Sequence, residues 1–260
     1  EVTHQYVNPE ILASGYTNLN WKTILNPNRK NLSQTTMKQT LQDTSGDTQL
    51  KELHVSKIMK ADVSLDGEVI RETESVPINL SSDGSVILPS NKGESYVIYT
   101  STMVPFGLQT TLTSKISWLN GKEEIDTVDQ KVTSTSLVEK KAITKQYVAD
   151  QPLEWEITYN PKSVLIPKEE AVLVDTINSA NHTLDESSIN VDGNTPYNIT
   201  TNSKGFTITF EQNVTQPVKV TYQTNFKQTS SSDASNIAKT GTQIVSASIK
   251  VPANAADVDS

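Results

Sequence analysis

The side chains that most often carry enzyme chemistry are scarce in this sequence. None of the 260 residues is cysteine, which excludes disulfides, cysteine-based zinc sites, thioesters and cysteine nucleophiles. His4, His54 and His182 lie far apart, and we interpret them as surface or turn residues rather than as members of a catalytic triad. The sequence has no glycine-rich phosphate loop and no convincing pair of catalytic carboxylates. We therefore expect no cofactor, no metal and no conventional enzyme activity.

Charge and hydropathy exclude further classes of partner. The formal net charge is -8 at pH 7, and the pI is about 5.0. A chain without a basic footprint is not expected to bind nucleic acid or an anionic membrane surface. It also contains no run of about 20 apolar residues, so no inserted membrane segment is predicted.

The residue pattern predicts strands rather than helices. Residues 206–210 and 218–222 alternate apolar and polar side chains, which is typical of half-buried strands. Glycine turn signals separate such runs at Asp66-Gly67, Asp83-Gly84, Asn120-Gly121, Asp192-Gly193 and Lys204-Gly205. Short strands with turns at this density indicate an all-β sandwich or barrel.

The sequence also contains an internal repeat. Residues 21–27 and 155–161 share a Trp, an Asn and a Pro at the same spacing. Further landmarks follow in the same order in both halves: Gln39-Thr40-Leu41 with Asp175-Thr176-Ile177, and Val97 to Thr100 with Val220 to Gln223. We predict two tandem domains at residues 1–134 and 135–252, followed by a disordered tail or linker at residues 253–260.

The second repeat has a recognisable order of motifs. A Lys140-Lys141 pair precedes the Trp155 strand, Asp175-Thr176-Ile177 follows it, and Asn236-Ile237-Ala238 comes near the end. This order resembles the collagen-binding-domain modules (Cna-type, MSCRAMM) of Gram-positive cell-wall-anchored adhesins. The resemblance covers residues 137–251 and, more weakly, the first repeat. It implies two tandem Ig-like β-sandwiches of the DEv-IgG type.

The resemblance also implies an intramolecular isopeptide bond in the second domain. By position in the family pattern, Lys141 is the amine, Asn236 on the last strand is the amide that loses ammonia, and Asp175 is the catalyst. Lys140 is the alternative amine, because neighbouring strand residues face opposite sides and only one of the pair can face the core. Burial would favour the neutral amine and the protonated acid that the reaction needs. Such a bond forms once, so the protein would not thereby be an enzyme.

The first repeat lacks the residues for this reaction. Counting from the shared landmarks, Val7 takes the place of Lys141 and Gln39 that of Asp175, and the place of Asn236 falls near Thr113. None of the three can perform the chemistry, so we expect no cross-link in residues 1–134.

The implied function is adhesion. A family member of this kind would be an extracellular, monomeric segment that binds a host extracellular-matrix protein, with collagen as one candidate. The wall anchor of the full-length protein would lie outside this fragment. The alternative is a structural stalk or pilin-like spacer that has no ligand and displays another tip domain.

Overall fold

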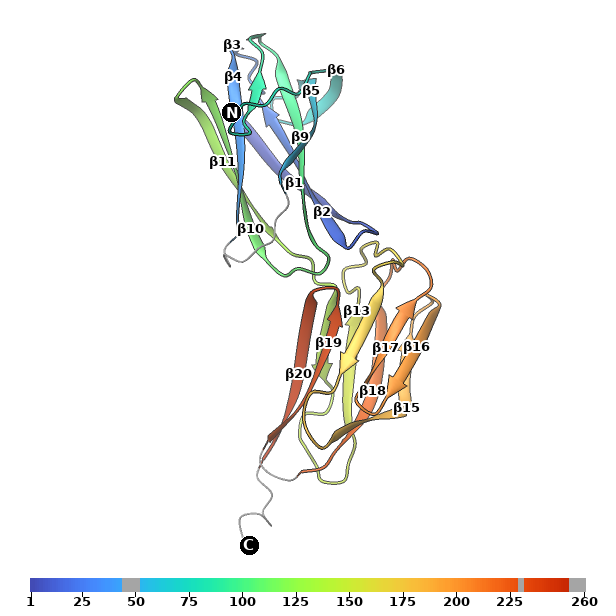
Figure 1. Ribbon diagram of the computed structural model, residues 1–260. Helices are drawn as coiled ribbons and strands as arrows, with labels where there is room; N and C mark the ends of the chain where they lie inside the picture. Colours follow the sequence, from blue (N-terminus) through green and yellow to red (C-terminus); the bar gives the residue numbers. More distant parts are fainter. Residues whose placement is uncertain (44–51, 229–231, 253–260) are drawn as a thin grey trace. The chain divides into compact units, whose positions relative to one another are not determined.

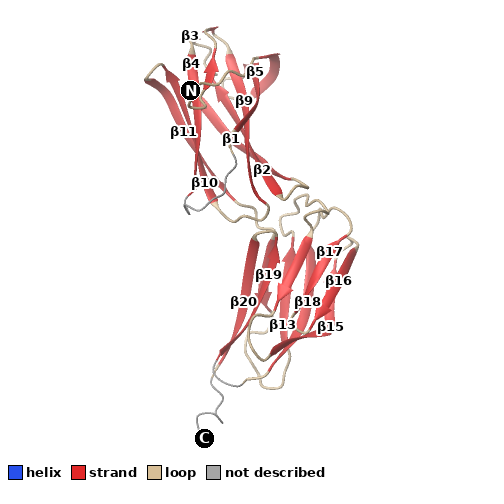
Figure 2. Ribbon diagram, in the orientation of Figure 1, coloured by secondary structure: helices blue, strands red, loops and turns tan. Residues whose placement is uncertain are grey.

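The computed structural model describes residues 1–43, 52–228 and 232–252, and every regular element in them is a strand (Figure 2). The predicted all-β class is therefore confirmed. The chain divides into two compact units. The first unit comprises Glu1–Glu10, Thr17–Val104 and Thr110–Ser134, and the second comprises Ile11–Tyr16, Pro105–Gln109 and the chain from Thr135 on. The tail predicted at residues 253–260 lies outside the described residues.

The first unit is a sandwich of two antiparallel sheets (Figure 1). One sheet has the order β1 (Val2–Ile11), β2 (Tyr16–Leu25), β9 (Ser95–Pro105), β5 (His54–Val63) and β6 (Val69–Ser75). The other has the order β11 (Glu123–Thr133), β10 (Thr111–Asn120), β4 (Thr35–Asp43) and β7 (Val86–Leu88). A small separate pair is formed by β3 (Asn31–Leu32) and β8 (Asn91–Lys92).

The second unit repeats this design. One sheet has the order β12 (Val138–Ala142), β13 (Leu153–Tyr159), β18 (Val218–Phe226) and β15 (His182–Asp192). The other has the order β16 (Tyr197–Asn202), β17 (Gly205–Phe210), β14 (Val172–Thr176), β19 (Ser232–Thr240) and β20 (Gln243–Val251). The first strand β12 also contacts β19 and β20 of the facing sheet, which brings the two ends of this unit together.

Alternating apolar side chains form the core of each unit. In the second unit, Trp155, Ile157 and Tyr159 of β13 are fully buried and face Leu173 and Ile208 of the other sheet. The strand periodicity of two places every second side chain on this inner face. Apolar contact across the gap between the sheets stabilises the sandwich and holds any polar group on the inner face away from water.

The repeated Trp-Asn-Pro landmark has a structural cause. Asn26 and Asn160 end their strands with a positive φ of 58°, a conformation that Asn tolerates better than most residues. The Asn160 side chain accepts a hydrogen bond from the Val164 amide (3.0 Å) and donates one to the Val164 carbonyl (2.8 Å). Asn26 makes the same pair with Lys30, at 3.0 and 2.8 Å. Each Asn therefore closes the turn that follows the Trp strand.

Candidate functional site

Strand β12 decides which of two adjacent lysines enters the core. The side chain of Lys140 has no exposed surface, whereas that of Lys141 is 66% exposed and lies 3.9 Å from Glu156. The assignment of Lys141 as the reactive amine is therefore wrong, because its side chain leaves the opposite face of the strand. Lys140, the alternative, is the lysine that lies in the core.

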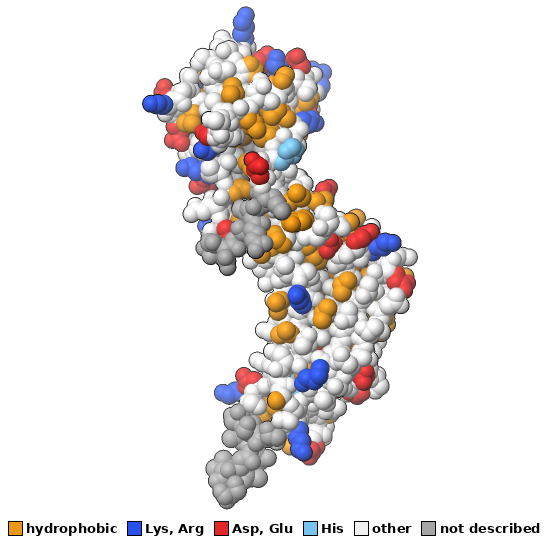
Figure 3. Space-filling view, in the orientation of Figure 1, with side chains coloured by type: hydrophobic (Ala, Val, Ile, Leu, Met, Phe, Trp, Pro, Cys, Tyr) orange, Lys and Arg blue, Asp and Glu red, His pale blue; other side chains and the backbone are white. Residues whose placement is uncertain are grey.

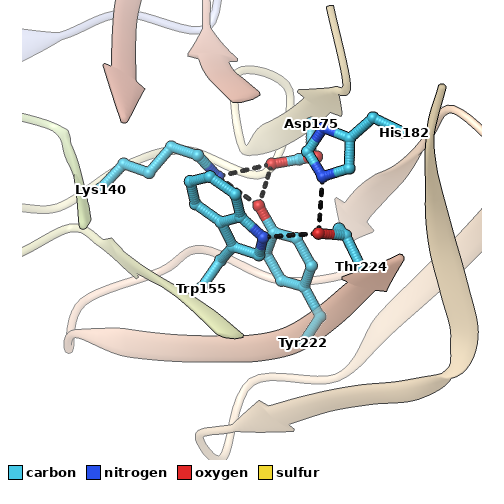
Figure 4. A network of polar contacts seen from close by, with 6 residues as sticks. All are labelled: Lys140, Trp155, Asp175, His182, Tyr222 and Thr224. Carbon is cyan, nitrogen blue, oxygen red and sulfur yellow. Dashed lines mark hydrogen bonds and ion pairs between the residues drawn. The ribbon is translucent and has the colours of Figure 1, made fainter. Parts of the chain in front are cut away.

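Asp175 is the partner of the buried lysine. It lies on β14, and its carboxylate Oδ2 accepts a hydrogen bond from Lys140 Nζ at 2.9 Å (Figure 4). The Asp175 side chain is also fully buried. The backbone of Asp175 pairs with Phe206 on one side and Ala238 on the other, so the middle of the sheet fixes its position.

Asn236 lies on β19, two residues before the Ala238 that pairs with Asp175. It is fully buried, and its strand is the next to last of the unit rather than the last, as the family pattern implied. Burial raises the pKa of both Asp175 and Tyr222, and the Asn236 amide lies close enough to oppose part of that rise. Even so, neither its Oδ1 nor its Nδ2 makes a hydrogen bond of good geometry within the described residues, and nor does Asp175 Oδ1. Three buried polar atoms without such a bond are costly, which marks this place as a site.

Tyr222 completes the group, and the sequence analysis used it only as a landmark. It lies on β18 directly opposite Trp155, and its Oη donates a hydrogen bond to Asp175 Oδ2 at 2.7 Å. Lys140 Nζ in turn donates to Tyr222 Oη (Figure 4). The signal that could have identified it is its alternation with Val220 and Thr224, which places a polar tip on the inner face.

Burial shifts the buried pair toward its neutral form. Loss of hydration lowers the pKa of Lys140, and the neighbouring Asp175 carboxylate only partly opposes this. Burial likewise raises the pKa of Asp175, against the opposing effects of Lys140, Tyr222 and Asn236. An uncharged amine next to a protonated acid is the starting state that amide exchange requires.

A second hydrogen-bond network lies next to the site and links Trp155 to the backbone beside Asn236. Trp155 Nε1 donates to Thr224 Oγ1 at 2.8 Å, and Thr224 Oγ1 lies 2.6 Å from His182 Nε2 (Figure 4). His182 Nδ1 lies 2.8 Å from Ser179 Oγ, which accepts the amide of Ser235, the residue before Asn236. Burial lowers the pKa of His182 to about 4. The expectation that this histidine lies at the surface is therefore wrong.

The first unit holds a neutral network at the corresponding place. His4 is buried and lies 2.8 Å from Thr23 Oγ1 and 2.7 Å from Ser114 Oγ, so it is also not a surface residue. Gln39 donates to Ser114 Oγ at 2.8 Å and accepts from Thr100 at 2.6 Å. Hydroxyl, amide and imidazole groups thus fill the position that a lysine, a carboxylate and an amide hold in the second unit.

Strand register identifies the corresponding residues. Gln39 pairs with Ile116 as Asp175 pairs with Ala238. Ser114 therefore corresponds to Asn236, and it directly follows Thr113, near which the sequence placed this counterpart. The Asn26 amide bonds the carbonyl of Glu1 as the Asn160 amide bonds that of Leu137. His4 follows Glu1 by three residues, as Lys140 follows Leu137, so His4 is the counterpart of Lys140.

The assignment of Val7 is therefore wrong. The chain runs 25 residues from Glu1 to Asn26 but only 23 from Leu137 to Asn160. The position of Val7 comes from counting back from the Trp strand by the same number of residues in both units. Because the first unit has two more residues in this stretch, that count ends at the wrong residue.

The described residues meet the requirements of neither a metal centre nor a membrane-spanning helix. Across residues 1–43, 52–228 and 232–252, no three His, Cys, Asp or Glu side chains gather in a way that could hold a metal ion. The described part of the chain also has no helix of the length and apolarity that crossing a membrane requires.

Comparisons with known proteins give only weak similarities. No family model matches the sequence, and no curated protein matches it. Among solved structures, the C-terminal domain of the Streptococcus agalactiae AgI/II polypeptide BspA is similar, with 11% identity, 96% of this chain and 100% of that chain covered, and a TM-score of 0.41. The C-terminal domain of the Streptococcus pyogenes antigen I/II-family protein AspA is also similar, with 9% identity and a TM-score of 0.42. That match covers 96% of this chain and 99% of the AspA domain.

A third similar structure is the collagen-binding domain of the Erysipelothrix rhusiopathiae surface protein RspB, with 12% identity. The match covers 96% of this chain and 93% of that domain, at a TM-score of 0.35. Because all three TM-scores are below 0.5, the functional assignment depends on the residues of the site.

Proposed function

We propose that this chain is an extracellular segment of a bacterial surface adhesin, whose second unit ties itself together with a Lys140–Asn236 isopeptide bond. One observation carries the proposal: a fully buried lysine, hydrogen-bonded to a fully buried aspartate, shares the core with a buried asparagine amide that lacks a well-formed hydrogen bond. Leaving such groups buried in a sandwich core costs several kcal/mol, on the order of 1–3 for each lost hydrogen bond. Forming the covalent bond removes from the core the buried amine group and the Asn236 amide nitrogen, which makes no well-formed hydrogen bond among the described residues.

The chemistry is an amide exchange in which atoms balance. The neutral Lys140 amine attacks Cγ of Asn236, and Asp175 gives its proton to the amide oxygen as the tetrahedral centre forms. The bond from Cγ to Nδ2 then breaks, and Nδ2 leaves as ammonia. One hydrogen of the amine stays on the new amide. The other passes to the Asp175 carboxylate and from there to the departing nitrogen. As the carbonyl re-forms, the proton on its oxygen returns to Asp175, which therefore ends protonated, as it began.

Holding the groups in one core replaces an external catalyst. The two strands that carry Asp175 and Asn236 are hydrogen-bonded neighbours, and β12 brings Lys140 against them. Fixing reacting groups at contact distance supplies a large share of the rate enhancement, which suits a reaction that occurs once in each molecule.

The bond would shield most of the second unit from tension. A pull applied at residues 137 and 252 would pass from β12 through the cross-link to β19 and then along β20. The strands between Lys140 and Asn236 would carry no load. A protein that is tethered to a cell wall and holds a host surface under flow needs this property.

The first experiment is the intact mass of the denatured full chain. A mass lower than the sequence value by one ammonia, with a proteolytic fragment that joins the peptides of Lys140 and Asn236, is expected. An unshifted mass would overturn the cross-link and leave a tandem β-sandwich of undefined role.

For the ligand, we propose a host extracellular-matrix protein, with collagen as one candidate and a monomeric chain as the binding form. The supporting feature is the β5–β6 hairpin, in which Leu65 of the turn is 99% exposed and Ile70 of β6 is 71% exposed. Figure 3 shows hydrophobic atoms on the visible face of this unit, among charged side chains of both signs. Exposed apolar groups of this kind are common at binding surfaces.

The alternative is a structural spacer that displays another tip domain. A second unit with an internal cross-link would suit this role equally well. Surface plasmon resonance against a panel of matrix proteins separates the two. Binding that is lost in Leu65→Ser with Ile70→Ser, but kept in the control Ile244→Ser, favours the adhesin. Absence of binding to every component favours the spacer.

A further inference from the structure

Tyr222 contacts the amine and the acid of the proposed reaction, Lys140 and Asp175, without being part of the bond. Its ring packs edge-on against Phe206, with the centroids 5.1 Å apart, so apolar contact fixes the direction of the phenol. Its Oη lies between Lys140 and Asp175 (Figure 4). A role for this residue rests on the proposed cross-link.

The contacts of Lys140 determine where its lone pair points. A neutral amine has two hydrogens and one lone pair around the nitrogen. One N–H is donated to Asp175 Oδ2 at 2.9 Å, and the other is donated to Tyr222 Oη. With both hydrogens bound to oxygen, the lone pair takes the remaining direction around the nitrogen.

The contacts of Asp175 determine where its proton lies. Oδ2 accepts hydrogen bonds from both Lys140 and Tyr222, so it acts as the carbonyl oxygen of the acid. The acidic proton then belongs on Oδ1, which makes no hydrogen bond among the described residues, as is also true of the two polar atoms of the Asn236 amide. This is the oxygen from which a proton can pass to Asn236.

We propose that Tyr222 is a fourth catalytic residue of the cross-linking reaction. Its Oη accepts a hydrogen bond from the Lys140 amine and donates one to Asp175 Oδ2. The first bond directs the lone pair of Lys140 toward the Asn236 amide, and the second keeps the proton of Asp175 on Oδ1, where it can reach the same amide. Without the phenol oxygen, the Lys140 amine can rotate, and the proton of Asp175 can move to Oδ2. Preorganised donors and acceptors of this kind contribute strongly to rate because they need no rearrangement during the reaction.

The test is the rate of ammonia loss in Tyr222→Phe, which removes Oη and keeps the ring. The full chain is synthesised in a cell-free system, samples are denatured at intervals, and the fraction lighter by one ammonia is measured. We expect Tyr222→Phe to react at least about a hundredfold more slowly than the wild type. Tyr159→Phe is the matched control, because Tyr159 is equally buried but bonds Thr240 outside the site.

Each outcome separates the two proposals. A wild-type chain that never loses ammonia overturns the cross-link itself. A wild-type chain that reacts, with Tyr222→Phe equally fast or with both phenylalanine variants equally slow, overturns the role of Tyr222 alone. Should Tyr222→Phe fail to fold, a fluorinated tyrosine at position 222 keeps the shape and weakens Oη as an acceptor. A slower reaction then supports the proposal, and an unchanged rate overturns it.

Discussion

His4 occupies in the first unit the position that Lys140 occupies in the second. Each lies on the first strand of its unit, three residues after the carbonyl that bonds the Asn of the Trp strand. His4 bonds only hydroxyl groups there, Thr23 and Ser114, whereas Lys140 bonds a carboxylate and a phenol. One backbone design thus supports a neutral hydrogen-bond network in one unit and a group of reactive side chains in the other.

The two adjacent lysines give a direct test of the site. We expect Lys140→Ala to keep the full sequence mass and Lys141→Ala to lose one ammonia like the wild type, because only Lys140 is buried beside Asp175. Mass spectrometry of the denatured variants measures this. Ammonia loss in Lys140→Ala, or its absence in Lys141→Ala, would show that the reactive amine is not Lys140.

Removal of the cross-link should lower the stability of the second unit. Lys140→Met keeps the length of the side chain and removes the cross-link, and Asp175 stays buried as the neutral acid because burial raises its pKa. A large part of its effect is therefore to free the chain between positions 140 and 236 in the unfolded state. By analogy with disulfides, closing a loop of this length is worth about 4–5 kcal/mol. For a unit of this size that corresponds to a drop in Tm of about 15 °C or more, measured by calorimetry. Lys141→Met should unfold at the wild-type temperature, and equal values for the two variants would contradict the prediction.

The first unit should lose stability as the pH falls from about 6.5 to about 4. Burial lowers the pKa of His4 in the folded chain from 6.5 to about 4, so between these values the unfolded state binds more protons than the folded state. Stability from this group is fully present above pH 6.5 and is lost as the pH falls toward 4. Urea unfolding of the wild type and of His4→Gln, each at pH 7 and pH 5, measures the effect.

His182 lies in the second unit and also has a lowered pKa. Because it is present in both the wild type and His4→Gln, the difference in stability between these two proteins isolates the effect of His4. We expect the loss of stability between pH 7 and pH 5 to be smaller in His4→Gln. An equal loss in both chains would mean that protonation of His4 does not weaken the fold.

Gly205 should be intolerant of a side chain. It pairs with Thr176 at a φ of +148°, and a Cβ there would lie 2.1 Å from the carbonyl oxygen of Asp175. We expect Gly205→Ala to displace β14, lower the Tm and slow ammonia loss, because the backbone of Asp175 must move. Gly84→Ala is the control: its φ of +83° is also strained, but nothing lies within 4 Å of the added Cβ. Wild-type cross-linking in Gly205→Ala would show that Asp175 tolerates the shift.

Local sequence patterns were sufficient for the class of fold. Alternation and glycine turns predict strands because side chains on a strand face opposite sides in turn, and the described residues form strands throughout their regular structure. The Trp-Asn-Pro landmark was visible in both repeats because Asn26 and Asn160 meet the same backbone requirement.

By itself, the sequence determined that Lys140 and Lys141 face opposite sides and that Asp175 and Asn236 follow them in the family order. Only the tertiary structure decided which lysine is buried, that Tyr222 joins the site, and that His4 and Ser114 are the counterparts in the first unit. The physical reason is that the strand period of two shows which side chains share a face, but not which of the two faces packs against the core. That choice depends on strand pairing between segments distant in sequence, and on connections whose length differs between the repeats.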